Sequence, residues 1–223
     1  IPEDNLDDCE DFKDFKEIVL KPVSSINTVF DNIFGEKDIN DLIISLNGEA
    51  PEPEGVFNAQ ATSKALITAV GNRDPFGTPF DKPEELSEGP VLTAFRKVVP
   101  DIVCMIATKE TIENALRTKV MIEGMTTEKC LVEIKETEID NPTDYDRLYI
   151  SILNIIQEIE GLIEGKEVFL SLSSGTPQMH VIFINLLQKN KIKAYPIQVM
   201  EPRFVESWDE RVRVVRSEYL GIG

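Results

Sequence analysis

Short apolar runs alternate along most of this chain with longer segments of helical periodicity, and this alternation restricts the fold more than any other feature. The apolar runs have the length of strands, whereas the segments between them place Leu and Ile three and four residues apart. We expect strands at 65–70, 101–107, 130–135, 167–172 and 192–199, helices at 90–98, 109–124, 145–164 and 177–190, and a terminal hairpin or edge strands at 204–205 and 212–215. Strands joined by helices of this length predict an α/β fold with a largely parallel sheet and helices on both faces.

One strand-to-helix connection has the composition of a ligand site. An apolar strand ending at Leu172 runs into the Ser-Ser-Gly-Thr turn at residues 173–176, and Pro177 opens the next helix. The unpaired N–H groups and the positive dipole end of that helix favour an anion. The hydroxyls of the turn add donors, and Gly175 lets a ligand approach the backbone closely. A well-capped connection without a ligand explains the turn equally well, so the functional reading needs a second loop of matching chemistry.

The loop after the first strand is that second candidate. It begins at Gly71, carries turn signals at Asp74 and the following proline, and stays irregular to about Pro90, which is longer than most connections of this kind. Arg73 is the natural partner of an anion, because a guanidinium binds phosphate through two parallel hydrogen bonds. An ion pair of Arg73 with Asp74 or Glu84 is the alternative. In open α/β sheets ligands bind at the carboxyl ends of the strands, where both loops are expected.

Four sequence elements follow one another in a recognisable order. They are the Gly-Asn-Arg-Asp-Pro loop at 71–75, the segment 88–110 with its helix start and second strand, Asn-Pro-Thr-Asp-Tyr at 141–145, and Ser-Gly-Thr-Pro-Gln-Met at 174–179. Together they resemble the CARF family, the CRISPR-associated Rossmann-fold sensor domains of type III CRISPR systems. The resemblance covers roughly residues 63–200 and implies a Rossmann-like sensor domain at 63–223. Residues 1–62 lie outside it and are expected to form an acidic, partly helical appendage and linker.

The resemblance implies a function and a set of ligand residues. Members of the family bind cyclic oligoadenylate, an antiviral second messenger, across the two-fold axis of a homodimer. We therefore expect a sensor that favours cyclic tetra-adenylate over cyclic hexa-adenylate and controls an attached effector allosterically, with no cofactor and no metal. The residues assigned to the ligand are Gly71, Asn72, Arg73, Asp74, Thr108, Lys109, Ser173, Ser174, Gly175, Thr176, Gln178 and Met179. For Met179, a place in the core is the alternative.

Whether the chain is also an enzyme stays open at this point. The HEPN ribonuclease attached to many members of the family needs an Arg shortly before a His, but His180 is the one histidine and no Arg lies within the ten residues before it. We expect His180 at the helix surface or an interface rather than on the ligand. The alternative function is a ring nuclease that cleaves the cyclic oligoadenylate, with Ser173, Ser174, Thr176 and Lys109 aligning the ribose 2′-hydroxyl. Because the pattern offers no general base, no catalytic residue is assigned.

Two further classes of nucleotide-binding protein are disfavoured. A dinucleotide-binding enzyme would carry Gly-x-Gly-x-x-Gly after the first strand, and this chain does not. A binder of duplex nucleic acid is disfavoured by the net charge of −17, because the phosphate backbone would be repelled. Residues 1–60 hold 15 acids and four bases, so much of the charge lies there. A small anionic ligand remains compatible, since charges further away than ~8–10 Å are screened.

Cysteine usage and hydropathy indicate a cytoplasmic location for this chain. Cys9, Cys104 and Cys130 are widely separated, which argues against a zinc site, and the last two are expected to be buried in strands. No apolar run approaches the ~20 residues that cross a bilayer. Because residue 1 is Ile rather than Met, we expect a segment upstream of it. One candidate is a membrane helix, which would place the full-length protein at the inner membrane.

Overall fold

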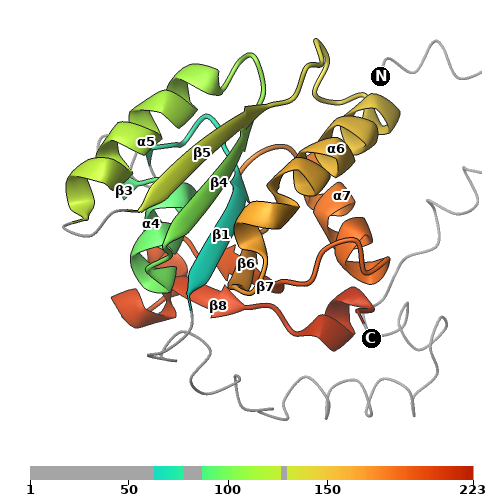
Figure 1. Cartoon of the computed structure of the whole chain (residues 1–223). Helices are drawn as coiled ribbons and strands as arrows, with labels where there is room; N and C mark the ends of the chain where they lie inside the picture. Colours follow the sequence, from blue (N-terminus) through green and yellow to red (C-terminus); the bar gives the residue numbers. More distant parts are fainter. Residues whose placement is uncertain (1–62, 78–86, 127–129, 223) are drawn as a thin grey trace, which may run out of the picture. The chain divides into compact units, whose positions relative to one another are not determined.

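A six-stranded sheet forms the centre of the domain (Figure 1). The computed structural model describes residues 63–77, 87–126 and 130–222, and the predicted appendage at 1–62 lies outside these ranges. All neighbouring strands are parallel except the last pair, which is antiparallel. The order across the sheet is β5 (Leu131–Glu136), β4 (Ile102–Ala107), β1 (Lys64–Ala69), β6 (Glu167–Ser171), β7 (Tyr195–Val199) and β8 (Val212–Val214).

The strand order places a topological switch point between β1 and β6. From β1 the chain builds the sheet outward through β4 to β5, then returns to lay β6 on the other side of β1. Thr68 of β1 lies in register with Met105 of β4 and Ser171 of β6. The connections after β1 and β6 therefore leave opposite faces of the sheet, which opens a crevice between them. This is the Rossmann-like α/β arrangement that the alternation of strands and helices predicts.

Helices cover both faces of the sheet and enclose two apolar layers. Helices α4 (Pro90–Val98) and α5 (Ile112–Met125) pack on one face, whereas α6 (Tyr145–Ile163) and α7 (Pro177–Gln188) pack on the other. Strand β1 is fully buried between the layers, as parallel strands usually are. Its Ile67 packs with the α6 and α7 side, and the next residue back, Leu66, packs with the α4 and α5 side. This alternation follows from the pleat of the strand.

Two of these helices begin at side-chain caps. The carboxylate of Asp144 accepts a hydrogen bond from Arg147 N at 3.2 Å and opens α6. At α7 the hydroxyl of Thr176 accepts from Met179 N at 3.3 Å, and Pro177 occupies the first helical position, where its missing N–H is no loss. The Ser-Ser-Gly-Thr turn therefore serves as a cap, which is one of its two expected roles.

Several predicted boundaries are wrong, and each has a local cause. The loop predicted to be irregular up to Pro90 contains a small antiparallel pair, β2 (Phe76–Gly77) and β3 (Ser87–Glu88). Helix α5 begins three residues later than predicted because the Thr111 hydroxyl accepts the N–H of Thr108 at 2.9 Å and forms a turn. Strand β7 begins at Tyr195 rather than at 192.

The C-terminal segment also differs from the expected hairpin. Phe204 lies in a short 3-10 helix, η3 (Pro202–Phe204), so the predicted strand at 204–205 is wrong. Strand β8 does form within the predicted 212–215, but it pairs with β7. Two more 3-10 turns flank it, η4 (Trp208–Arg211) and η5 (Ser217–Leu220).

The cysteines and the helices bear on two further expectations. Cys104 is fully buried, and burial raises the pKa of its thiol to about 12. Cys130 is only half-buried, so its predicted burial in a strand is wrong; burial still raises its pKa to about 11. Among the residues that the structure describes, no helix combines the length and the apolar character that crossing a membrane requires.

A candidate ligand site at the switch point of the sheet

A single buried carboxylate joins the two predicted ligand loops. Asp74, in the loop after β1, is 2% exposed. Its Oδ1 accepts a hydrogen bond from Val91 N in the first turn of α4 at 2.9 Å. Its Oδ2 accepts from Gly71 N at 2.9 Å and from the hydroxyl of Ser174, which belongs to the loop after β6. Asp74 therefore ties together both loops and the start of α4.

Burial decides the ionisation of this carboxylate. Desolvation raises the pKa of Asp74, although the three hydrogen bonds and the nearby Arg73 act to lower it. Ser174 is also buried, at 5% exposed. Both side chains point into the protein and hold the loops in place, so their predicted contacts with a ligand would require them to leave these partners.

Replacing Asp74 by asparagine is expected to change how stability depends on pH. A raised pKa means that the folded protein protonates Asp74 more readily than the unfolded chain, for which the value is 3.8. The stability contributed by this group is thus complete below pH 3.8 and is lost as the pH rises through the raised value. The free energy of unfolding, measured with urea at a series of pH values, should fall for the wild type relative to Asp74→Asn as the pH rises above 3.8. The same pH dependence in both proteins would contradict this prediction.

A control of opposite sign is available just before β4, at Asp101. Hydrogen bonds from the Ser63 hydroxyl and from Lys64 N lower the pKa of Asp101. Its contribution to stability is present above pH 3.8 and is lost as the pH falls. Asp101→Asn should therefore remove part of the loss of stability in acid, in contrast to Asp74→Asn.

Gly175 packs too closely against its neighbours to carry a side chain. Its φ of +94° lies in a region that L residues rarely adopt. A Cβ built on it would lie 2.5 Å from Ala69 Cβ and 2.8 Å from Met179 Sδ. Met179 is itself fully buried in the layer beneath α7. Met179 therefore occupies the core, which is the alternative to ligand contact that the sequence analysis names. Packing against Ala69 and Met179 is by itself enough to require glycine at position 175.

Two further residues at the β6 turn, Ser173 and His180, line the crevice. The Ser173 hydroxyl accepts from Val199 N at 2.7 Å and so holds the turn against β7. His180, in the first turn of α7, places Nε2 2.9 Å from the carbonyl oxygen of Ser174. Gln178 is partly exposed. His180 is half-buried and lines a groove beside the ends of β6 and β7, and its expected place at the helix surface or an interface stays a prediction.

The remaining predicted residues lie around this crevice. Gly71 accepts a hydrogen bond from Asn114 Nδ2 at 3.1 Å through its carbonyl oxygen, and Asn72 is exposed. Thr108 and Lys109 follow β4, on the far side of β1 from β6. Thr108 is buried, whereas Lys109 is exposed and pairs with Asp140, which raises the pKa of Lys109. The fold thus brings the β1 and β6 loops together and sets the β4 loop to one side.

A groove of about 230 Å³ opens beside the two loops. Its walls come from segments far apart in the chain: the β1 loop, the start of α4, the β6 turn, α7 and the ends of β7 and η4. The lining residues are Arg73, Glu88, Pro90, Leu172, Ser173, His180, Gln198, Val199, Met200, Glu201 and Arg211. Of these, the sequence predicted only Arg73 and Ser173 as ligand residues. Glu201 and Arg211 belong to an irregular C-terminal segment in which no local pattern marks them.

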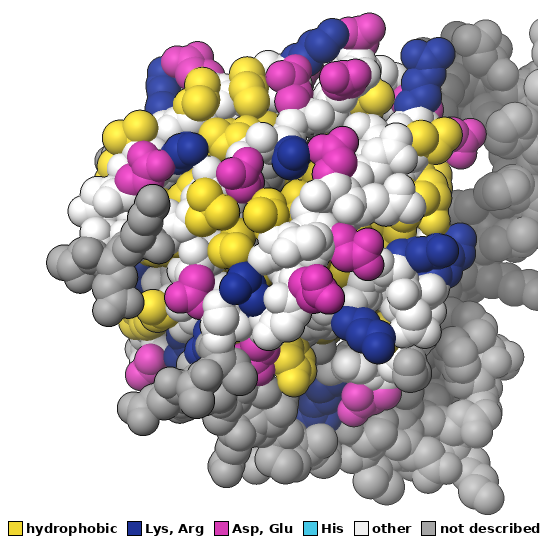
Figure 2. Space-filling model, viewed as in Figure 1, with side chains coloured by type: hydrophobic (Ala, Val, Ile, Leu, Met, Phe, Trp, Pro, Cys, Tyr) yellow, Lys and Arg dark blue, Asp and Glu magenta, His cyan; other side chains and the backbone are white. Residues whose placement is uncertain are grey.

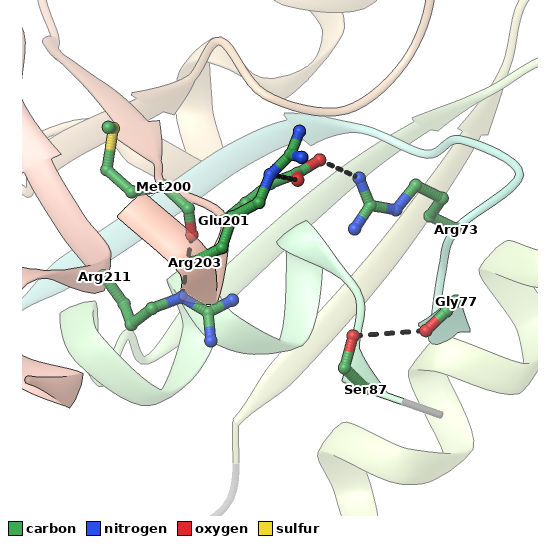
Figure 3. Close-up of polar contacts among 7 residues, drawn as sticks. All are labelled: Arg73, Gly77, Ser87, Met200, Glu201, Arg203 and Arg211. Carbon is green, nitrogen blue, oxygen red and sulfur yellow. Dashed lines mark hydrogen bonds and ion pairs between the residues drawn. The ribbon is translucent and has the colours of Figure 1, made fainter. Parts of the chain in front are cut away.

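Two arginines, Arg73 and Arg211, and two glutamates, Glu88 and Glu201, line this groove, and Figure 3 shows all of them except Glu88. Arg73 Nη1 lies 2.8 Å from Glu201 Oε1, and Arg203 Nε lies 3.1 Å from Glu201 Oε2. Arg211 Nε donates to the carbonyl oxygen of Met200 at 2.7 Å. Arg73 therefore forms an ion pair, which is the alternative to anion binding that the sequence left open, but its partner is Glu201 rather than Asp74. The other expected partner, Glu84, lies outside the described residues.

The surface elsewhere has a different character. On the face shown in Figure 2, acidic and basic side chains are interspersed among apolar ones. At the groove, by contrast, Arg73, Arg203 and Arg211 gather around the carboxylate of Glu201. These guanidinium groups near the carboxyl ends of the strands make the groove a candidate site for an anion.

Comparison with known proteins agrees with this architecture. Residues 131–214 match the family profile described as the Cas_Csm6 CARF domain. The chain carries a CARF domain. The matched residues run from β5 to β8 and include the β6 turn and Arg211. The β1 loop with Arg73 precedes the matched residues. Its place in the site is supported by the Asp74–Ser174 hydrogen bond and by the groove that Arg73 lines.

The proteins that this chain resembles include two named Csm6. The CRISPR system endoribonuclease Csm6 of Streptococcus thermophilus is 30% identical over 145 residues, which are 63% of this chain and 31% of that protein. The chain thus spans less than a third of that relative's length. The solved structure of Enterococcus italicus Csm6 bound to cyclic hexa-2′-fluoro-hexa-dAMP superimposes with a TM-score of 0.57 at 23% identity, over 71% of this chain and 44% of that one. Can2 from Sulfobacillus thermosulfidooxidans, in complex with cyclic tetra-adenylate, is a more distant likeness (TM-score 0.43, 15% identity, 61% of this chain and 32% of that one).

Proposed function

We propose that this CARF domain is a sensor of type III CRISPR antiviral signalling that binds cyclic oligoadenylate over the carboxyl ends of β1 and β6. The observation that carries the proposal is the arginine-lined groove at the switch point, where the two ligand loops meet. Ligands of open α/β sheets bind in this crevice, and phosphodiesters are anions that guanidinium groups hold through paired hydrogen bonds. A relative named as a CRISPR system endoribonuclease and a solved structure of Csm6 support the proposal.

The β6 turn supplies donors for such a ligand. Ser173 and Thr176 use their hydroxyl oxygens to accept backbone N–H groups, so each hydroxyl hydrogen is still available to donate. The first turn of α7 adds unpaired N–H groups and the positive end of a helix dipole. Phosphate or ribose oxygens placed over this turn would meet donors from both the side chains and the backbone.

The form of the ligand suggests the assembly. A cyclic oligoadenylate is built of equal halves, so a two-fold protein presents the same loops to each half. We propose a homodimer with one ring across its axis. The sequence resemblance favours cyclic tetra-adenylate. The Csm6 of Enterococcus italicus was solved with a cyclic hexanucleotide analogue, so both ring sizes need to be tested.

The output of the sensor is proposed to lie in an attached module that ligand binding controls allosterically. The Csm6 relative is an endoribonuclease, and this chain spans 31% of its length. A ribonuclease module of that kind is one candidate for the effector. The membrane segment predicted upstream of Ile1 is the other.

The test is a calorimetric titration with cyclic tetra-adenylate and cyclic hexa-adenylate. We expect binding of one ring at about one per dimer, and loss of about 10- to 100-fold in affinity in Arg73→Ala, since a charge-assisted hydrogen bond contributes roughly 1.5–3 kcal/mol. Arg117→Ala is the matched control, because Arg117 is an exposed arginine of α5 paired only with Glu113. Absence of heat with both rings would overturn the proposal.

Chromatography of the ligand after incubation separates the two functions. Intact ligand identifies a sensor. Linear products would identify the ring nuclease, with the hydroxyls of the β6 turn as the first residues to replace.

A further inference from the structure

We propose that Arg211 is a second phosphate-binding residue of this site and acts together with Arg73. The inference rests on the proposed function and names a residue that no sequence motif indicates. Arg211 ends η4, immediately before β8, and lies 138 positions after Arg73 in the chain. Only the return of the chain alongside β7 brings the two arginines to one groove (Figure 3).

The guanidinium of Arg211 is oriented by the backbone. Its Nε donates to Met200 O at 2.7 Å, across the connection between β7 and β8. Within the part of the chain that the structure describes, its two terminal nitrogens form no hydrogen bond. An arginine held through Nε still presents its terminal N–H groups as a fork, which is the arrangement that binds a phosphate through two parallel bonds.

The carboxylates near Arg211 are already occupied. Glu201 pairs with Arg73 and Arg203, and Glu88 pairs with Arg96 at 2.8 Å. Three arginines around this groove therefore share two carboxylates, and Arg211, a fourth arginine, has no direct ion pair among the described residues. Burial lowers the pKa of Arg211 and the positive charge of Arg73 acts in the same direction, whereas Glu88 and Glu201 act to raise it. A partly desolvated cation beside another cation is stabilised when an anion binds between them.

The size of the groove indicates how much of the ring it takes. Its volume of about 230 Å³ is below the ~300–1,000 Å³ typical of pockets for whole drug-sized ligands. We infer that it takes only part of a ring, centred on one phosphate, rather than a complete ring. Each protomer would then hold one such part through Arg73 and Arg211, and the rest of the ring would lie over the β6 turns.

The test compares two neighbouring arginines by titration with whichever ring the wild type binds. Arg211→Gln should weaken binding by roughly tenfold or more, because a charge-assisted contact is lost. Arg213→Gln is the control: Arg213 is an exposed residue of β8, it pairs with Glu210 at 3.3 Å, and its loss changes the net charge equally. It should stay within about twofold of the wild type, since exposed charges are screened. The slope of log affinity against log salt should become shallower by about 0.7 in Arg211→Gln alone.

A third variant separates charge from structure. Arg211→Lys loses the Nε hydrogen bond to Met200, as Arg211→Gln does, but keeps the positive charge. If Arg211 contacts phosphate, Arg211→Lys should bind with an affinity between those of the wild type and Arg211→Gln. Equal losses in the lysine and glutamine variants, with lowered melting temperatures, would show a structural role and overturn the inference. Wild-type affinity in Arg211→Gln, or an equal loss in Arg213→Gln, would also overturn it.

Failure of the proposed function has a different signature. If the wild type binds neither ring, the three variants are titrated with inorganic tripolyphosphate. The arginine site stands if the wild type binds this probe and Arg211→Gln alone loses it. It is overturned if tripolyphosphate does not bind or binds all variants equally.

Discussion

Asp74→Ala is expected to lower the free energy of unfolding by about 3–5 kcal/mol. The substitution removes the acceptor of three hydrogen bonds, from Gly71 N, Val91 N and the Ser174 hydroxyl, in a place that is 2% exposed. Each buried donor left without a partner costs roughly 1–3 kcal/mol, and relief of the buried charge offsets part of the sum. Equilibrium urea unfolding followed by circular dichroism measures the change.

Two comparisons make this result specific. Ser174→Ala removes one of the three partners and should cost about 1 kcal/mol. Asp146→Ala removes an exposed acid from the first turn of α6 and should cost less than that. An Asp74→Ala protein as stable as Asp146→Ala would refute the role of Asp74 in joining the two loops.

Gly175→Ala is expected to lower the free energy of unfolding by about 2–5 kcal/mol. At a φ of +94° an alanine is strained by roughly 1–2 kcal/mol. Its Cβ would also lie 2.5 Å from Ala69 Cβ, at the end of β1, so β1 and α7 must separate, at about 1–3 kcal/mol. Thermal and urea unfolding should both report the loss.

Gly161→Ala is the matched control for this substitution. Gly161 lies in α6, where a Cβ would meet nothing within 4 Å. Alanine is the better helix former, so this variant should be more stable by about 0.5–1 kcal/mol. If Gly175→Ala also proved neutral or stabilising, the close packing of the β6 turn on β1 would be wrong. Loss of ligand binding in a Gly175 variant can therefore arise from disturbed packing as well as from a lost contact with the ligand, so its stability must be measured alongside its affinity.

Local chemistry explains which parts of the fold the sequence could predict. Helix α4 occupies the predicted 90–98, and α6 ends one residue before the predicted 164, because periodicity and capping act within a few residues. The small β2–β3 pair was missed because two-residue strands leave no pattern of their own. Apolar and polar residues alternate on both sides of Trp208, as in a hairpin, yet β8 pairs with β7 instead. The edge of the sheet at β7 offers unpaired backbone groups, and local propensity does not reveal such a partner.

The sequence by itself determined the order of the elements, the apolar faces of the helices and the polar character of the loops after β1 and β6. The tertiary structure alone decided what those loop residues do. It turned Asp74 and Ser174 inward as partners, placed Met179 in the core, and brought Arg211 and Glu201 into the same groove as Arg73. The physical reason is that strand order and side-chain burial depend on contacts between residues more than a hundred positions apart. Such contacts follow from packing and hydrogen bonding of the whole sheet, not from any local spacing.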